Sequence, residues 1–173
     1  MKLNVEQLVQ EMTLEEKAGL CSGENFWFTK AVERLGIPGI MVTDGPHGLR
    51  KQAKQADHLG LNASVEAVCF PAGCALASSF DRALLQSVGE KLGEEAWSEH
   101  VHTLLGPAIN IKRSPLCGRN FEYLSEDPYL AGELAASYIN GVQSQDVGVS
   151  VKHFACNNQE RRRMSVSARI SQR

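Results

Sequence analysis

The chain has 173 residues, of which 43% are hydrophobic and 22% are charged, and its net charge at pH 7 is −2. This composition is typical of a soluble globular domain and excludes a disordered tail, a coiled coil and a collagen-like fibre. The small negative charge argues against binding to nucleic acid or to an anionic membrane surface. No run of about 18 apolar residues exists, so no membrane span is expected.

The first half of the chain predicts helices followed by short strands. The first twenty residues carry apolar side chains at helical spacing, with Asn4 and Thr13 as N-caps and a capping box after Thr13. A short apolar strand is expected over 37–43, before a turn that is rich in glycine. Residues 51–68 are polar and predict a long surface loop. Residues 69–77 are small and apolar, and we expect a second strand there.

The second half of the chain alternates between helices and strands. The expected elements are a helix capped by Ser79 or Asp81, a strand over 101–111, a helix that begins at Asp127-Pro128, and a strand over 147–151. This order predicts an α/β fold built from parallel β/α units, in which the loops after the strands meet at one edge.

Long polar side chains follow these strands, and they suit a polyhydroxylated neutral ligand. They are Asp44, Arg119, Lys152 and His153. A sugar hydroxyl both donates and accepts hydrogen bonds, so carboxylates and cationic side chains can hold it from opposite sides. Each residue alone also has a structural interpretation: Asp44 as the cap of its turn, and Arg119 as the partner of Glu122 or Glu126.

Other sites are less favoured by the sequence. It contains no glycine-rich motif for dinucleotides, no P-loop, no GxSxG elbow and no HExxH helix. The five cysteines have no CxxC spacing, which favours free thiols in a cytoplasmic protein. The pair His100 and His102, together with a cysteine, leaves a metal-dependent hydrolase as a distant alternative. The run 161–163 predicts a solvated positive charge, with contact to a ligand or partner as the alternative.

Three motifs, in this order, resemble those of glycoside hydrolase family 3, the β-glucosidase-like enzymes. Residues 36–50 read GIPGIMVTDGPHGLR and are similar to the first-strand motif of that family. Residues 105–122, together with Ser-Glu-Asp-Pro at 125–128, resemble the third-strand signature, and residues 151–160 resemble the Lys-His motif. The resemblance extends from near residue 5 to the end of the chain.

The resemblance implies the first half of a (β/α)8 TIM-type barrel, with about four β/α units. Residues 1–173 would form part of the N-terminal barrel domain, without the later strands and the second domain. Asp44, Arg119, Lys152 and His153 would bind the non-reducing glycosyl unit of a β-glucoside or oligosaccharide. Arg113 and Glu122 would brace the loop behind them. The family hydrolyses β-glucosides, and in some members xylosides or arabinosides, with retention and without a cofactor.

No catalytic residue is expected within this chain. In the family, the nucleophile is an Asp in a Ser-Asp-Trp motif, which this sequence lacks, and the acid/base lies further along the chain. The expectation is therefore a truncated enzyme that binds sugar without cleaving it. Two alternatives remain: a sugar-binding half barrel completed by a second copy, and a split gene whose missing C-terminal half supplies both carboxylates.

Overall fold

A small parallel sheet lies at the centre of the structure. The computed structural model describes residues 4–53 and 63–171. Its strands are β1 (Val42–Asp44), β2 (Thr103–Leu105) and β3 (Gly148–Val149), and they pair in the order β1-β2-β3. Val42 lies opposite Thr103, and Thr103 lies opposite Gly148, with all pairs parallel. The predicted α/β fold with parallel strands is confirmed.

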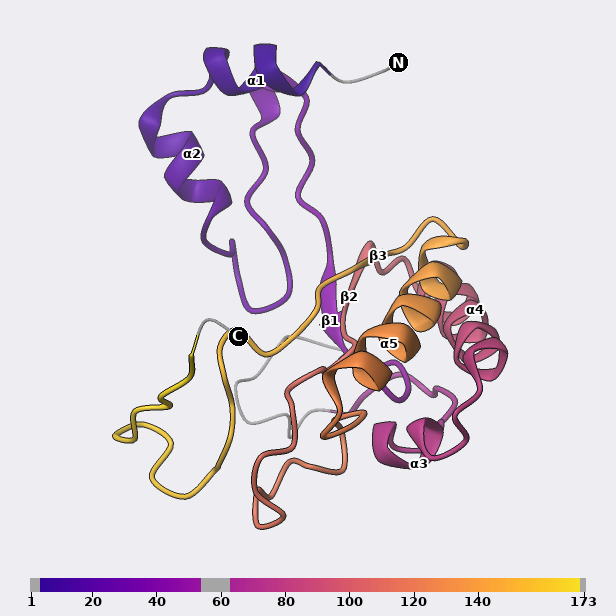
Figure 1. The fold of residues 1–173 in the computed structure, drawn as a ribbon. Helices are drawn as coiled ribbons and strands as arrows, with labels where there is room; N and C mark the ends of the chain where they lie inside the picture. Colours follow the sequence, from indigo (N-terminus) through magenta and orange to yellow (C-terminus); the bar gives the residue numbers. More distant parts are fainter. Residues whose placement is uncertain (1–3, 54–62, 172–173) are drawn as a thin grey trace.

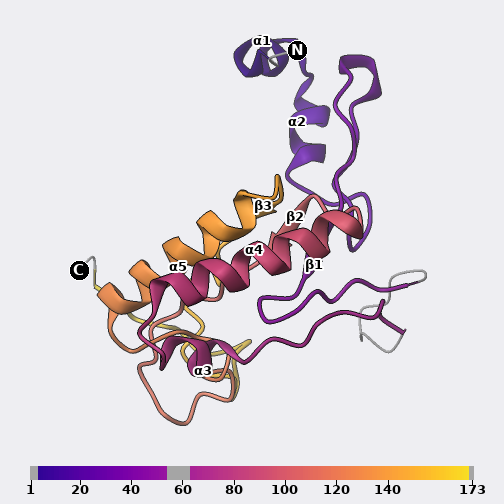
Figure 2. The same cartoon turned by 90° about the vertical axis from the view of Figure 1, so that its right-hand side faces the viewer.

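Two long helices, α4 (Arg82–Ser98) and α5 (Pro128–Gln143), lie side by side against this sheet (Figures 1 and 2). Asp81 caps α4 by accepting hydrogen bonds from the backbone N–H groups of the first turn, and Asp127 does the same for α5. Both N-caps were among those predicted from the sequence. The main core cluster joins apolar side chains from both helices to β2; it includes Leu92, Leu104 and Val142. This packing holds the carboxyl ends of the strands in place.

The N-terminal helices α1 (Val5–Glu11) and α2 (Leu14–Leu20) project away from the sheet (Figure 1). Their predicted caps are present: Asn4 accepts from Gln7 N–H, and Thr13 and Glu16 form the capping box. A 3-10 turn, η1 (Glu33–Leu35), precedes the extended segment that leads into β1. No helix in the described part of the chain is long and apolar enough to cross a membrane.

One of the strands predicted from the sequence is wrong, because the structure has a helix there. Residues 69–77 contain a short helix, α3 (Gly73–Ala77), so the described residues hold three strands of the sheet and not four. A run of small apolar residues has no clear period, and alanine and leucine favour the helix. Leu76 and Ala77 then pack against Leu85 and Val88 of α4, which stabilises α3 as a helix.

The other strands are shorter than predicted. The segment 101–111 is paired regularly only over β2, because Pro107 has no N–H for a ladder. The segment 147–151 is paired regularly only over β3, although Lys152 further along makes a single parallel bridge to Ala108. Within the predicted loop 51–68, residues 54–62 lie outside the described residues.

Candidate functional site

Asp44 is presented at the carboxyl end of β1 by a tight turn. The turn contains Gly45 at φ 134° and Gly48 at φ 140°, which are conformations that side chains with a Cβ rarely adopt. A Cβ on Gly45 would lie 2.2 Å from the carbonyl oxygen of Gly48. The turn closes through a hydrogen bond of 3.0 Å from the Arg50 N–H to the Asp44 carbonyl. The glycines therefore fix where the Asp44 carboxylate lies.

Lys152 reaches Asp44 across the sheet. Its Nζ donates to Asp44 Oδ1 at 2.6 Å, although the two residues are 108 positions apart in the chain. The Lys152 backbone is anchored on both sides, since its N–H donates to the Pro107 carbonyl and its carbonyl accepts from the Ile109 N–H. Partial burial acts to raise the pKa of Asp44, but the hydrogen bond and charge of Lys152 outweigh it and hold that pKa below its usual range. Asp44 is therefore a carboxylate at neutral pH.

Arg119 joins a second group of side chains. Its Nε donates to the buried carboxylate of Glu122, and its Nη2 lies 2.7 Å from His153 Nε2. A guanidinium only donates, so this contact assigns His153 as a neutral ring whose Nε2 accepts. Burial, together with the positive charges of Arg119 and Lys152, lowers the pKa of His153 and favours the same neutral form.

A polar network behind His153 was not predicted from the sequence. Tyr123 is 1% exposed, and its hydroxyl lies 3.3 Å from His153 Nδ1. The amide of Asn157 donates both to that hydroxyl, at 2.9 Å, and to Glu160 Oε1, at 2.7 Å. Asn110 Oδ1 accepts from the His153 backbone N–H at 2.8 Å. Arg119 and Tyr123 thus hold the two ring nitrogens of His153, and Asn110 holds its backbone. The sequence signals for these residues are that Asn110 lies within the third-strand signature and that Asn157 and Glu160 lie within the Lys-His motif.

His47, from the turn after β1, is a further residue that sequence reasoning missed. Its Nε2 accepts a hydrogen bond of 2.8 Å from the Gly73 N–H at the start of α3. The next residue, Cys74, donates its N–H to the Phe121 carbonyl in the loop that carries Arg119. Burial lowers the pKa of His47, which keeps the accepting nitrogen unprotonated. His47 therefore ties the turn after β1 to that loop.

The four predicted binding residues come together in two pairs. Lys152 pairs with Asp44, His153 pairs with Arg119, and the peptide bond between Lys152 and His153 joins the pairs. One proton of the Lys152 ammonium is used by Asp44, and two remain for another acceptor. The result is a row of donors and acceptors of both charges, which suits the hydroxyl groups of a sugar.

The remaining candidates differ in where they lie. Glu122 contacts Arg119 within the site, whereas Arg113 Nη1 donates to the Arg169 carbonyl at 3.3 Å. His102 Nδ1 accepts from the Met41 N–H at 3.1 Å. Among the residues that the structure describes, no three His, Cys, Asp or Glu side chains gather closely enough to hold a metal ion.

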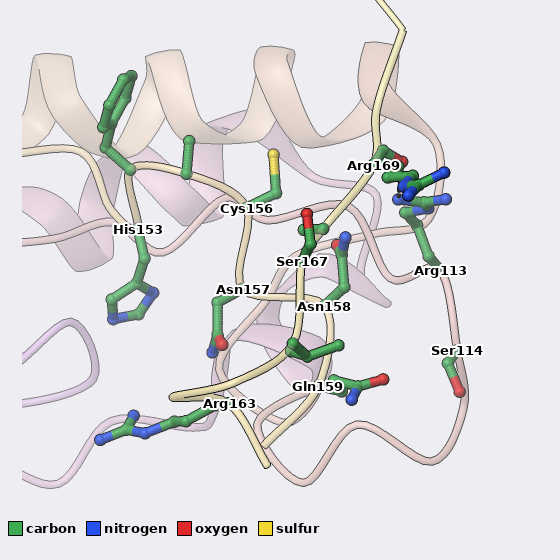
Figure 3. Close-up of a pocket in the computed structure, with 14 residues that line it drawn as sticks. Arg113, Ser114, His153, Cys156, Asn157, Asn158, Gln159, Arg163, Ser167 and Arg169 are labelled. Carbon is green, nitrogen blue, oxygen red and sulfur yellow. Dashed lines mark hydrogen bonds between the residues drawn. The ribbon is translucent and has the colours of Figure 1, made fainter. Parts of the chain in front are cut away.

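An open cavity of about 710 Å³ lies beside His153 (Figure 3). It is bounded by residues 153–159 of the segment after β3, by Arg163 and residues 166–169 further along, and by Arg113 and Ser114 across from them. His153 therefore borders both the pairs described above and this cavity. A ligand that contacts His153 has room to extend into it.

Comparison with known proteins finds relatives that match nearly the whole chain. A thermostable beta-glucosidase B from Acetivibrio thermocellus is 62% identical over all 173 residues, and an exo-alpha-(1->6)-L-arabinopyranosidase from Bifidobacterium breve is 55% identical over 95% of this chain. The chain spans only 23% and 22% of the lengths of these two relatives.

Solved structures show the same fold. The family 3 beta-glucosidase of Bifidobacterium adolescentis superposes with a TM-score of 0.84 at 55% identity, over 95% of this chain and 23% of that one. Beta-glucosidase 3B of Thermotoga neapolitana, solved in complex with alpha-D-glucose, superposes with a TM-score of 0.80 at 42% identity, over 91% of this chain and 24% of that one. The model of the glycosyl hydrolase family 3 N-terminal domain matches residues 11–162, and the chain therefore belongs to that family.

Proposed function

We propose that this chain supplies the sugar-binding part of a β-glucosidase. Asp44, Arg119, Lys152 and His153 hold the hydroxyl groups of the terminal glycosyl unit, and Glu122 fixes the orientation of Arg119. The observation that carries the proposal is the hydrogen bond between Lys152 Nζ and Asp44 Oδ1, because it sets a donor and an acceptor side by side at the carboxyl ends of β1 and β3. The relative from Thermotoga neapolitana was solved with glucose bound, which supports the same ligand class.

The same proposal assigns no chemical step to Asp44. Retaining hydrolysis of a β-glucoside needs a carboxylate nucleophile and a second carboxyl group that gives and takes a proton. Asp44 is paired with Lys152 and has a lowered pKa, so it is poorly suited to donate a proton. Both catalytic carboxylates come from polypeptide outside these 173 residues: the remaining part of a (β/α)8 barrel domain and a second domain, or a second chain.

A second candidate activity is the hydrolysis of an arabinopyranoside. The relative from Bifidobacterium breve is named for that activity and is 55% identical over 166 residues. The 62% identity to a beta-glucosidase over the whole chain makes the glucoside the better choice. Both sugars present ring hydroxyls to the same side chains, so the binding role of the four residues is common to the two activities.

Titration calorimetry with D-glucose tests the binding role. The wild-type chain is expected to bind glucose with a millimolar dissociation constant, and Lys152→Met is expected to abolish that binding. Lys91→Met is the matched control, since Lys91 makes an exposed ion pair with Glu94 on α4, away from the site. Loss of binding in both variants, or in neither, would contradict the proposal. L-Arabinose in the same titration separates the two sugars.

Hydrolysis of 4-nitrophenyl β-D-glucoside tests the assignment of the chemistry. The purified chain alone is expected to release no nitrophenol above the rate of buffer. Turnover that persists after separation from host glucosidases, and that falls in Asp44→Asn, would place a catalytic carboxylate inside this chain and overturn that part of the proposal.

A further inference from the structure

The cavity beside His153 has an unusual charge. Three of the fourteen residues that line it are arginines, Arg113, Arg163 and Arg169, and none is an aspartate or a glutamate. This contrasts with the site around Asp44 and Glu122, where each cation has a carboxylate partner. A positive wall without carboxylates favours an anionic group over a neutral hydroxyl.

Two of the three arginines have no carboxylate partner among the described residues. Arg113 and Arg169 lie at the same end of the cavity (Figure 3), where the Arg113 guanidinium donates to the Arg169 backbone carbonyl. Neither makes an ion pair within residues 4–53 and 63–171, whereas Arg163 pairs with Glu160 at 3.3 Å. Two positive charges in one place repel each other, and a bound anion relieves that repulsion.

Neutral donors complete the lining. The amide of Asn158 and the hydroxyl of Ser167 face the same cavity, and neither side chain makes a hydrogen bond within the described part of the chain. An oxyanion accepts several hydrogen bonds at once, and a guanidinium can bind two of its oxygens in parallel. Phosphate, sulfate and carboxylate groups all have this chemistry.

We propose that Arg113 and Arg169 bind an anionic group carried by the glycoside that His153 helps to hold. His153 lines the same cavity as the two arginines, so one ligand can contact both. This inference rests on the proposed function, and it assigns acidic glycosides, with a phosphate, sulfate or carboxylate substituent, as a substrate class of the site. A free inorganic anion shares the same chemistry, and the experiment separates the two sources.

Titration calorimetry in a buffer of low ionic strength tests this site with inorganic phosphate, glucose and glucose 6-phosphate as probes. Wild-type chain is expected to bind glucose 6-phosphate at least about tenfold more tightly than glucose, since a charged hydrogen bond typically supplies this much. Arg169→Gln and Arg113→Gln are expected to remove that advantage while leaving glucose affinity unchanged. Arg82→Gln removes the same charge from the exposed surface of α4 and is expected to keep the advantage.

The possible results are distinct. The proposed site is overturned if Arg169→Gln, Arg113→Gln and Arg82→Gln all prefer glucose 6-phosphate over glucose to the same extent, with native far-UV circular dichroism in each. The preference would then be a nonspecific effect of charge. Phosphate binding through the pair without any gain for glucose 6-phosphate overturns the glycoside as its carrier and leaves a site for a free anion. If phosphate binds through the pair but glucose does not bind at all, the proposed function fails while the anion site stands.

Discussion

The close contact between α4 and α5 depends on a glycine in each helix, and replacing one of them gives a prediction with a definite sign. A Cβ on Gly141 would lie 2.2 Å from the backbone carbonyl oxygen of Gln86 and 3.0 Å from the Cα of Gly89. These are backbone atoms of α4, so no side-chain rotation relieves the overlap, and the two helices must separate. Overpacking of this kind costs typically about 3 kcal/mol when the neighbours cannot move away. The better helix propensity of alanine returns about 1 kcal/mol.

Gly141→Ala is therefore expected to lower the free energy of unfolding by about 2 kcal/mol, or the Tm by about 5 °C for a chain of this length. Gly132→Ala is the matched control in the same helix, because no atom lies within 4 Å of its added Cβ. The control is expected to be more stable than wild type by about 0.5–1 kcal/mol. Urea unfolding followed by circular dichroism measures both. A Gly141→Ala variant as stable as wild type would refute the reasoning.

Three further predictions concern the site. Burial lowers the pKa of His47 in the folded protein, although the charge of Glu122 opposes this shift. The contribution of neutral His47 to the free energy of unfolding is therefore complete above the unfolded pKa of about 6.5, and it is lost as the pH falls towards the folded pKa. Urea titrations between pH 7 and pH 5 should show a steeper loss of stability in wild type than in His47→Gln; parallel curves would contradict this. Glu122→Gln leaves Arg119 without its charge partner and is expected to lower the free energy of unfolding by about 2 kcal/mol; the loss is smaller than for a fully buried pair because Arg119 is partly exposed. An unshifted urea midpoint would show that this pair adds nothing to stability. Tyr123→Phe removes a buried hydroxyl that accepts a hydrogen bond, and it is expected to lower the free energy of unfolding by about 1 kcal/mol. Urea unfolding measures this loss, and an unchanged free energy would contradict the prediction.

The sequence predicted the helices better than the strands. Helix caps are local, so Asn4, Thr13, Asp81 and Asp127 could be recognised within a few residues of each helix start. Strands need partners that are distant in the chain, and a buried parallel strand has no alternation to mark its limits. For this reason the segment 69–77 was wrongly expected to be a strand.

The same contrast applies to the candidate site. Charged residues just after the strands were visible in the sequence, and the topology brings Asp44 and Lys152 into contact across 108 positions. Tyr123 and Asn157 were not predicted, because their importance comes from contacts with the His153 ring and not from their residue types. Arg113 was expected to brace the loop, and only its position next to Arg169 shows that it faces a cavity.

Lys152 and His153 are consecutive residues, yet their side chains belong to different partners, Asp44 and Arg119. A single stretch of backbone, anchored to Pro107 and Ile109, therefore sets the geometry of both pairs at once. Under the proposed binding role, the two pairs cannot diverge separately in evolution, because a substitution that shifts this backbone to suit one sugar hydroxyl also moves the contact with another. We therefore expect changes in sugar preference to arise more easily through the loop that carries Arg119 than through the strand end itself.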